Sequence, residues 1–420
     1  MLEIFRNAWK VKDIRRKIIY TLVLLFVYRV GSFIPVPGVD SNLFQQYIAD
    51  SSVWAMFDIF NGGALSNFTI FATGITPYIT ASIVMTLLAV AIPALERLQK
   101  QGTEGRKKIS QITRYVGLGL ALAQSLGIMI AGPGRNALLH PVWYMFLFVG
   151  LIHAAGTALA MWLGEHITEK GIGNGISLLI FINIISRFPA LIQSGLAAVA
   201  DGRASGWLIP LVAAAVLALI AAIVFINLGE RRIPVQYAKK VVGRKMYGGQ
   251  STYIPMRVNN SGVLPLIFAV TIVQFPSMIL RIFFAEKAWA QSYLLAMSTS
   301  TWTYAIVTAL FIMAFAYFYS TIQFNPIEVS KNIQQYGGFV PGIRPGKPTS
   351  LYLSKVSNRI TFFSALFLAF LAMIPIVLTA QTGTSPIQAT SLLIMVSVAL
   401  ETAKQMESQM MMRHYKGFLS

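Results

Sequence analysis

Long apolar runs, separated by short polar and basic segments, follow one another along the whole chain. A helix of about 20 apolar residues crosses the ~30 Å hydrocarbon core of a membrane. We therefore predict ten membrane-spanning helices, at residues 18–35, 74–92, 113–132, 143–163, 175–195, 207–228, 262–284, 302–323, 360–380 and 386–406. The pattern predicts an all-α polytopic membrane protein with two five-helix halves, residues 1–200 and 201–420.

The stretch that precedes the second run is apolar but interrupted. Between residues 56 and 73 the polar or flexible positions are Asp58, Asn61-Gly62-Gly63 and Ser66-Asn67. Paired glycines destabilise a helix, and lipid offers no hydrogen bonds to an irregular backbone. The stretch is therefore either a short half-helix folded into the protein, leading into the second span, or an external loop at the membrane interface.

The basic residues are placed unevenly. Of the 34 Lys and Arg, 28 lie in the segments 1–17, 93–114, 164–174, 229–261, 324–359 and 404–420. Loops rich in Lys and Arg stay in the cytoplasm, so both termini are predicted to be cytoplasmic. The basic start followed by an apolar run resembles a signal peptide, but no small-residue cleavage site follows, and we expect a retained first helix.

Composition agrees with a membrane protein. The 420 residues are 55% hydrophobic and 12% charged, which excludes a soluble globular protein, where about 25% is usual. The net charge of +19 first suggests nucleic acid, but the charges sit in loops between apolar runs. The chain has no cysteine, so no disulfide or thiol chemistry is expected.

Two basic loops are too long to be simple connectors. Residues 229–261 alternate apolar and basic positions around Gly248-Gly249, which predicts a hairpin. In residues 324–359, Pro-Gly turns on each side of Arg344 are expected to hold its guanidinium at a loop tip. Long loops are often functional. A solvated loop that only sets topology is the alternative interpretation.

No catalytic or metal-binding motif is recognisable. The four histidines lack metal-ligand spacing, and the chain has no phosphate-binding or nucleophile motif. We therefore expect no cofactor, no metal and no enzyme activity. Away from the first and last few residues of the predicted spans, the charged residues are Arg29, Arg187 and Glu401. An ion-coupled transporter usually needs a carboxylate at its midplane, and Glu401 lies near the end of the tenth span instead. This weighs mildly against an ion-coupled transporter.

Seven motifs spread over nearly the whole chain closely resemble the bacterial SecY family. They are residues 28–38 (YRVGSFIPVPG), 61–66 (NGGALS), 74–79 (GITPYI), 162–165 (WLGE), 171–175 (GIGNG), 250–252 (QST) and 339–346 (FVPGIRPG). The last of these is highly specific. Residues 201–206 and the connection between the ninth and tenth spans match the family poorly.

The resemblance implies a protein-conducting channel, with ten helices around a central hourglass pore and a lateral gate toward lipid. The plug of the family falls on about residues 57–70, with Phe57, Asn61, Gly62, Gly63, Leu65 and Asn67. The apolar pore ring falls on Ile75, Ile79, Ile176, Ile180, Ile267 and Ile394. The lateral gate carries Thr80 and Phe275. Motor or ribosome docking falls on Arg244, Lys245 and Arg344. The i,i+4 spacing of two isoleucine pairs agrees with this but also fits ordinary helix packing.

The resemblance also implies partners and a location. They are the membrane subunits SecE and SecG, the SecA ATPase, the ribosome, preproteins with signal sequences, and membrane lipids, at a bacterial plasma membrane. The competing function is an ion-coupled secondary transporter for a small solute. A polar, charged midplane site would favour the transporter, whereas this chain offers isoleucines there.

Overall fold

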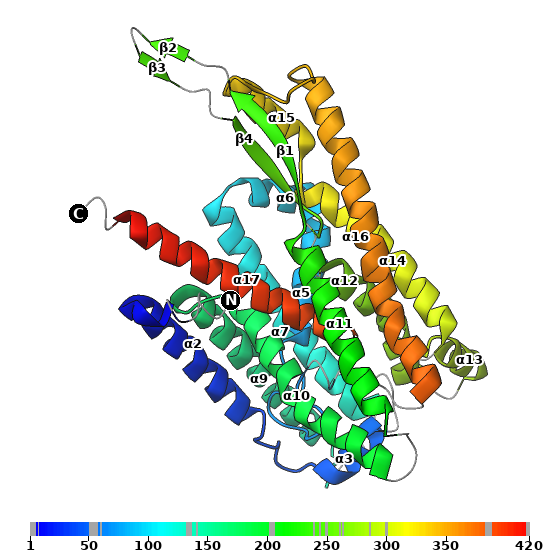
Figure 1. The fold of residues 1–420 in the computed structure, drawn as a ribbon. Helices are drawn as coiled ribbons and strands as arrows, with labels where there is room; N and C mark the ends of the chain where they lie inside the picture. Colours follow the sequence, from blue (N-terminus) through cyan, green and yellow to red (C-terminus); the bar gives the residue numbers. More distant parts are fainter. Residues whose placement is uncertain are drawn as a thin grey trace. The chain divides into compact units, whose positions relative to one another are not determined.

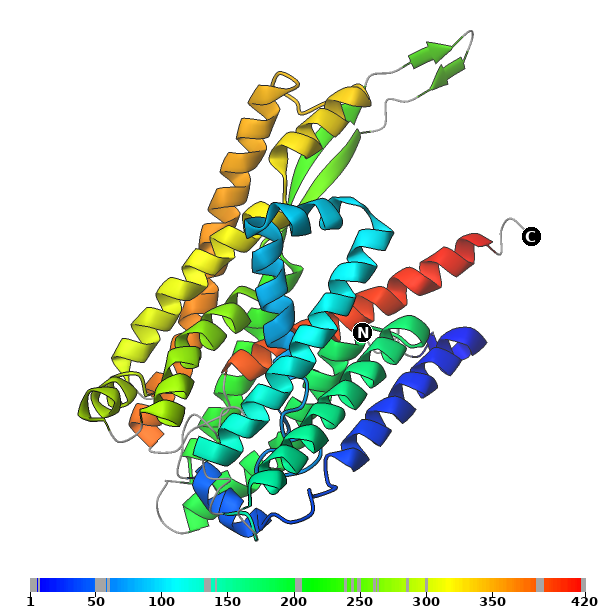
Figure 2. The same cartoon turned by 180° about the vertical axis from the view of Figure 1, so that it is seen from behind.

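The computed structural model describes residues 6, 8–49, 58, 61–131, 137–139, 142–200, 206–237, 240–242, 245–247, 251–259, 262, 264–284, 287–298, 301–382 and 389–416. The described chain is mainly helical (Figures 1 and 2). It divides into two compact units, residues 1–209, 274–299 and 394–420 in unit 1 and residues 210–273 and 300–393 in unit 2. These compact units differ from the predicted halves 1–200 and 201–420. The halves describe how the ten spans are divided into two sets of five, and they stay a prediction.

Each predicted span falls on a helix. The helices are α2 (Lys12–Gly31), α5 (Thr76–Ala91), α7 (Thr103–Ala131), α9 (Trp143–Lys170), α10 (Gly175–Ala200), α11 (Leu208–Leu228), α12 (Leu264–Phe283), α14 (Trp302–Gln323), α16 (Lys347–Thr382) and α17 (Ala389–Lys416). Among the described residues, five helices are long and apolar enough to cross a membrane, or six if one bent pair counts as a span. The others carry charged ends or an internal proline, which shortens their apolar part.

The bent pair is α5 and α6 (Pro93–Lys100), which meet at 100°. Proline disfavours the helical backbone of the residue before it. Ile92 accordingly adopts an extended conformation, with φ −106° and ψ 114°, and the helix turns there.

In unit 1, α7 packs against both α5 and α9, and α9 packs against α2 and α10. The short helices α3 (Ser41–Ala49) and α13 (Ala288–Ala296) also belong to this unit. Its largest buried side chains include Tyr28, Phe44, Phe68 and Phe71. Phe68 and Phe71 belong to the irregular segment at residues 61–75, and Tyr28 and Phe44 contact their rings, so that segment is part of the core.

In unit 2, α14 and α16 lie side by side (Figures 1 and 2). A small antiparallel sheet has the strand order β4 (Ser251–Arg257), β1 (Glu230–Tyr237), β5 (Gly338–Phe339). Two further strands, β2 (Lys240–Val242) and β3 (Lys245–Tyr247), pair at the tip of the hairpin (Figure 1). The helix α15 (Pro326–Gln335) packs on α16 and beside β5.

Candidate functional site

Residues 61–75, which we call the turn segment, form consecutive turns. The prediction of a half-helix is therefore wrong over these residues. Gly62, Gly63 and Gly74 have φ of +65°, +88° and +52°, and Phe68 has φ +47°, which no α-helix contains. Most of the segment is buried, so it is not an interfacial loop either. Phe57, predicted as the first plug residue, lies outside the described residues.

Two arginines from membrane helices bind this region. Arg29 of α2 donates a hydrogen bond from Nη1 to the Gly62 carbonyl oxygen at 3.0 Å. Arg187 of α10 forms an ion pair with Asp58, whose side chain is 1% exposed. These are the two arginines that the sequence places away from the ends of the predicted spans. Both arginines are half-buried, and the buried Asp58 carboxylate has Arg187 as its partner, as burial of a charge requires.

Asp58 also orders the backbone that follows it. Its Oδ1 accepts a hydrogen bond from the Ser66 backbone N–H at 2.8 Å. Its carbonyl oxygen accepts one from the Gly63 N–H at 3.0 Å. One carboxylate therefore binds both Arg187 and the backbone of the turn segment. A buried backbone N–H without a hydrogen-bond partner would be costly.

Asn61 closes the other end of the turn segment. Its amide donates to the Ala72 carbonyl oxygen at 2.9 Å and accepts from the Thr76 hydroxyl at 3.2 Å. The hydroxyl of Thr157, on α9, donates to the Gly74 carbonyl oxygen at 3.0 Å. Side chains of α5 and α9 therefore fix the point where the segment becomes a helix.

Close packing holds Gly62 in place. A Cβ atom on this residue would lie 2.9 Å from the Cα atom of Asn183 on α10. Asn183 in turn donates to the Tyr28 hydroxyl at 2.9 Å. Because Gly62 has both a positive φ and this close neighbour, only glycine fits here.

Apolar side chains of the turn segment enter the core. Leu65 is 2% exposed and packs in a cluster with Val36 and Phe44. The Phe68 ring lies 4.6 Å from that of Phe44 and 4.9 Å from that of His153. His153 is itself buried, with Nδ1 2.7 Å from the Ser125 hydroxyl. Asn67, half-buried, accepts from Gln45 at 2.8 Å.

The six predicted pore-ring isoleucines divide between the units. Ile75, Ile79, Ile176, Ile180 and Ile394 lie in unit 1, and Ile267 lies in unit 2. Ile75 and Ile394 are 2% and 3% exposed, and the others are half-buried. Ile176 packs against Gly164 of α9, with Cγ1 3.1 Å from where a Cβ would stand. Their arrangement as a ring stays a prediction.

The two predicted gate residues differ in environment. The Thr80 hydroxyl donates to the Thr76 carbonyl oxygen at 3.1 Å on its own helix, α5. Phe275, on α12, is 55% exposed and immediately precedes the internal Pro276. Their pairing at a lateral gate stays a prediction.

The predicted hairpin in residues 229–261 is confirmed. β1 and β4 pair antiparallel, with Ile233 opposite Ile254. In β1, Arg232 lies over the Tyr253 ring at 4.7 Å, and the Glu230 carboxylate raises the pKa of Arg232. Lys245 begins β3, whereas Arg244 lies outside the described residues.

Sequence reasoning missed that the two long loops form one sheet. Residues 338–339 pair with the end of β1, Gln236 opposite Phe339 and Tyr237 opposite Gly338. A shared core joins both loops, and it consists of Ile233, Val235, Met256, Ile333, Val340 and Leu353. The signal in the sequence was weak, because β5 has only two residues.

The loop tip with Arg344 has the predicted turns. The Ile343 N–H donates to the Val340 carbonyl oxygen at 3.0 Å across Pro341-Gly342. Gly342 and Gly346 have φ of +80° and +91°, as the third position of a type II turn requires. The Arg344 side chain is exposed, while its carbonyl oxygen accepts from the buried Thr349 hydroxyl at 2.8 Å. The guanidinium is therefore presented on a fixed backbone.

No group of three or more His, Asp or Glu side chains that could hold a metal is found among the described residues. The strongest clustering of charge, at Asp58, Arg29 and Arg187, is committed to holding backbone and to an ion pair. The arrangement is suited to hold a segment of irregular backbone in place.

Comparison with known proteins gives a consistent result. The SecY family model matches residues 69–403. The protein translocase subunit SecY of Streptomyces scabiei is 43% identical over 439 aligned positions, which cover 100% of both chains. That of Corynebacterium glutamicum is 42% identical, covering 98% of this chain and 99% of the relative.

Solved structures share the fold. A protein-conducting channel matches with a TM-score of 0.66 at 18% identity, over 93% of this chain and 91% of that one. A SecY protein, described as having a plug domain that stabilises the closed channel and maintains a membrane seal, matches with a TM-score of 0.65 at 16% identity over the same shares. Sec61 from a canine ribosome–channel complex matches with a TM-score of 0.62 at 18% identity, again over 93% and 91%.

Proposed function

Because this chain belongs to the SecY family, we propose that it is the protein-conducting subunit of a translocase and that its turn segment seals the closed channel. It passes unfolded preproteins across the membrane and releases apolar segments into the bilayer through a lateral gate. The small-solute transporter is set aside, since the relatives are translocase subunits. They are translocation subunits rather than enzymes, and no catalytic role is assigned here.

The observation that carries the sealing role is the way the turn segment is held. Its backbone is irregular and buried, and it is bound by Arg29 and Arg187 from two membrane helices. The segment is held by these polar contacts and by its buried apolar side chains, and because it is not a continuous helix it can leave its position as one piece. The plug described for a structural relative supports this role for residues 61–70.

The isoleucine ring is proposed to form the constriction. A channel for unfolded chains must pass every side chain, so it has no use for specific binding groups. Apolar constrictions stop ions and water by dewetting. The six isoleucines at Ile75, Ile79, Ile176, Ile180, Ile267 and Ile394 would close around a passing chain.

The two long basic loops, residues 229–261 and 324–359, are proposed to bind the partner that supplies the energy for translocation. The exposed Arg344, together with the hairpin residues Arg244 and Lys245, suits the carboxylates of a SecA-type motor or the phosphates of a ribosome. The canine ribosome–channel complex supports a ribosomal partner. SecE and SecG are proposed as the small membrane subunits.

The uneven placement of basic residues supports the orientation. The protein is proposed to lie in the plasma membrane of a bacterium. Because 28 of the 34 Lys and Arg lie in one set of segments, both termini and the loop that contains Arg344 are proposed to face the cytoplasm.

The lateral gate gives the sharpest test of this function. The chain has no cysteine, so the double variant Thr80→Cys, Phe275→Cys carries the only two thiols. A disulfide needs Cα atoms within roughly 7 Å, so it would lock two helices together. We expect the lock to stop export of signal-bearing chains into vesicles, reduction to restore it, and a long crosslinker to permit it.

Each single-cysteine variant is the control, since neither can form the lock within one chain. Export that proceeds at the parental rate with the disulfide fully formed would contradict the gate. Saturable uptake of a small solute, with no export under any condition, would contradict the channel itself.

A further inference from the structure

We propose that the cleft between α14 and α16 binds one anionic phospholipid, with its phosphate at Lys355 and Arg359 and an acyl chain along α16. The cleft has a volume of about 520 Å³. The residues that line it are Tyr317, Leu351, Ser354, Lys355, Asn358, Arg359, Phe362 and Phe363. All of them belong to unit 2.

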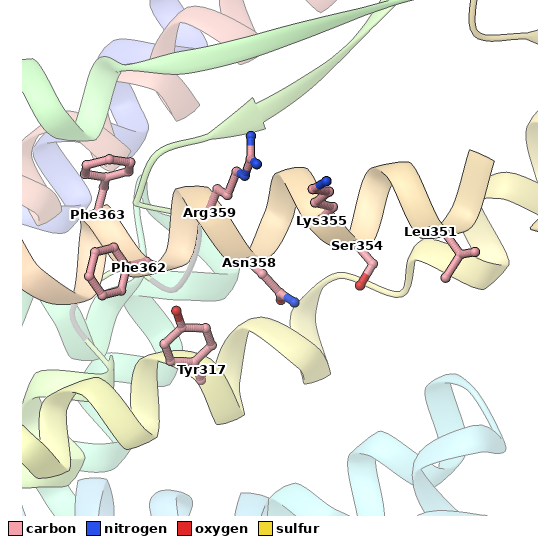
Figure 3. Close-up of a pocket in the computed structure, with 8 residues that line it drawn as sticks. All are labelled: Tyr317, Leu351, Ser354, Lys355, Asn358, Arg359, Phe362 and Phe363. Carbon is pink, nitrogen blue, oxygen red and sulfur yellow. The ribbon is translucent and has the colours of Figure 1, made fainter. Parts of the chain in front are cut away.

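The lining changes from polar to apolar along α16. Figure 3 shows Tyr317 on α14 pointing toward α16, on the side to which Asn358 points, whereas Lys355 and Arg359 point to the other side of α16. Arg359 is the last charged residue of α16, and the helix continues from Ile360 without another charge. The cleft therefore lies at the boundary between the aqueous and the apolar part of the helix, where a lipid has its phosphate.

The basic pair lacks counter-charges. Neither α14 nor α16 contains an Asp or Glu. Glu328, on the adjacent α15, forms no ion pair with Lys355 or Arg359 in the described part of the chain. Like charges at i,i+4 repel each other, so an anion placed between them relieves a local cost. Basic pockets at the ends of membrane helices select anionic headgroups in this way.

Hydrogen-bond donors accompany the charges. The side chains of Ser354 and Asn358 make no hydrogen bond among the described residues, and they lie one turn from each other on the cleft-facing side. A phosphodiester with a polar headgroup can accept from both. Tyr317 is a typical interfacial residue, since its ring is apolar and its hydroxyl is wet.

An apolar track leads away from the cleft. Phe363, Leu366 and Phe370 are 66%, 51% and 63% exposed and stand at i, i+3 and i+7 on α16. Beside the cleft, the hydroxyls of Ser320 and Thr361 are 2.8 Å apart and hold α14 against α16. The walls are therefore fixed, and the track matches an extended acyl chain. A partner's apolar helix would instead leave two charges buried without partners.

Lipid enrichment at the track tests the proposal. The full chain, purified with the membrane subunits that accompany it, carries a bimane label on Leu366→Cys and is placed in nanodiscs. Quenching is measured with brominated phosphatidylglycerol at about 20 mol % in phosphatidylcholine, and then with the bromines on the phosphatidylcholine. Each basic residue near a membrane surface contributes roughly fivefold to the affinity for an anionic lipid. We expect the ratio of anionic to zwitterionic lipid at the label to be at least about fivefold higher than the bulk ratio.

Matched variants separate charge from structure. Lys355→Gln with Arg359→Gln should return quenching to the bulk fraction, whereas Lys355→Arg with Arg359→Lys should keep the enrichment. A label on Leu217→Cys, 68% exposed on α11, should report the bulk fraction throughout. Quenching at Leu366→Cys that follows the bulk fractions of the two lipids overturns the proposal.

Two other outcomes also overturn it. Protection of the label from both lipids would mean that a partner helix covers the cleft. Loss of enrichment in millimolar inorganic phosphate would mean that the pair binds a free anion rather than a lipid.

Discussion

The turn segment of unit 1 and the Arg344 turn of unit 2 are both irregular, and both depend on glycines with positive φ. The first is buried and held by side chains that come from α2, α9 and α10. The second is exposed, and two Pro-Gly pairs next to Arg344 shape it locally. A segment held mainly by side chains from distant helices can be released by changing those side chains. The Pro-Gly pairs instead fix the backbone of the Arg344 turn within the turn itself, with one hydrogen bond from Ser330 of α15 to the Gly346 carbonyl oxygen at 2.7 Å.

The largest effect on stability is expected from Asp58→Ala. The substitution leaves Arg187 without its partner. Breaking a buried ion pair costs about 3–5 kcal/mol, and because Arg187 is 28% exposed we expect about 3 kcal/mol. Thermal unfolding of the detergent-purified protein measures the change.

The matched control for Asp58→Ala is the double variant Asp58→Ala, Arg187→Met. It removes both charges and should recover much of the loss. Equal destabilisation by the single and double variants would mean that the ion pair does not hold the turn segment.

Gly62→Ala is expected to be nearly as damaging. Its Cβ would lie 2.9 Å from Asn183, and a left-handed backbone costs L-residues about 1–2 kcal/mol. Overpacking adds about 1–3 kcal/mol, so the free energy of unfolding should fall by about 3 kcal/mol. Raised ion leak through reconstituted vesicles should accompany it. A neutral Gly62→Ala would contradict the close packing described here.

Gly342→Ala sharpens the comparison, because it shares the positive φ but has nothing within 4 Å of the added Cβ. Only the strain of the left-handed backbone remains, and we expect the free energy of unfolding to fall by about 1 kcal/mol. Hydrogen exchange in the β1–β4–β5 sheet should report the loss locally, with no change in ion leak. A leak as large as that of Gly62→Ala would erase the distinction between the two regions.

Arg344→Glu should have the smallest effect on stability, within about 0.5 kcal/mol, because the side chain is exposed. Motor-driven export into vesicles should nevertheless be lost. Arg344→Lys should rescue it only in part, because an ammonium cannot replace a planar guanidinium. Export at the parental rate by the glutamate variant would reduce the loop to a topology signal.

The sequence predicts those parts of the structure that nearby residues determine, and it fails where residues distant in the chain determine the conformation. The ten helices, the hairpin and the turns around Arg344 depend on local periodicity and turn chemistry, and the structure agrees with each. The turn segment was recognised as irregular, but its half-helix was wrong, since its conformation depends on Arg29 and Arg187 from helices distant in the chain. The strand β5 was missed because two residues carry no periodicity.

Strand order in the small sheet makes the two basic loops a single mechanical element. β1 is bonded on one edge to β4 and on the other to β5, so it is the central strand between segments far apart in the sequence. A displacement of the hairpin tip therefore pulls on Gly338 and Phe339, the residues that lead into the Arg344 turn. A partner that binds either loop acts, through the same strand, on the residues that lead into α16, the helix that contains the predicted span 360–380.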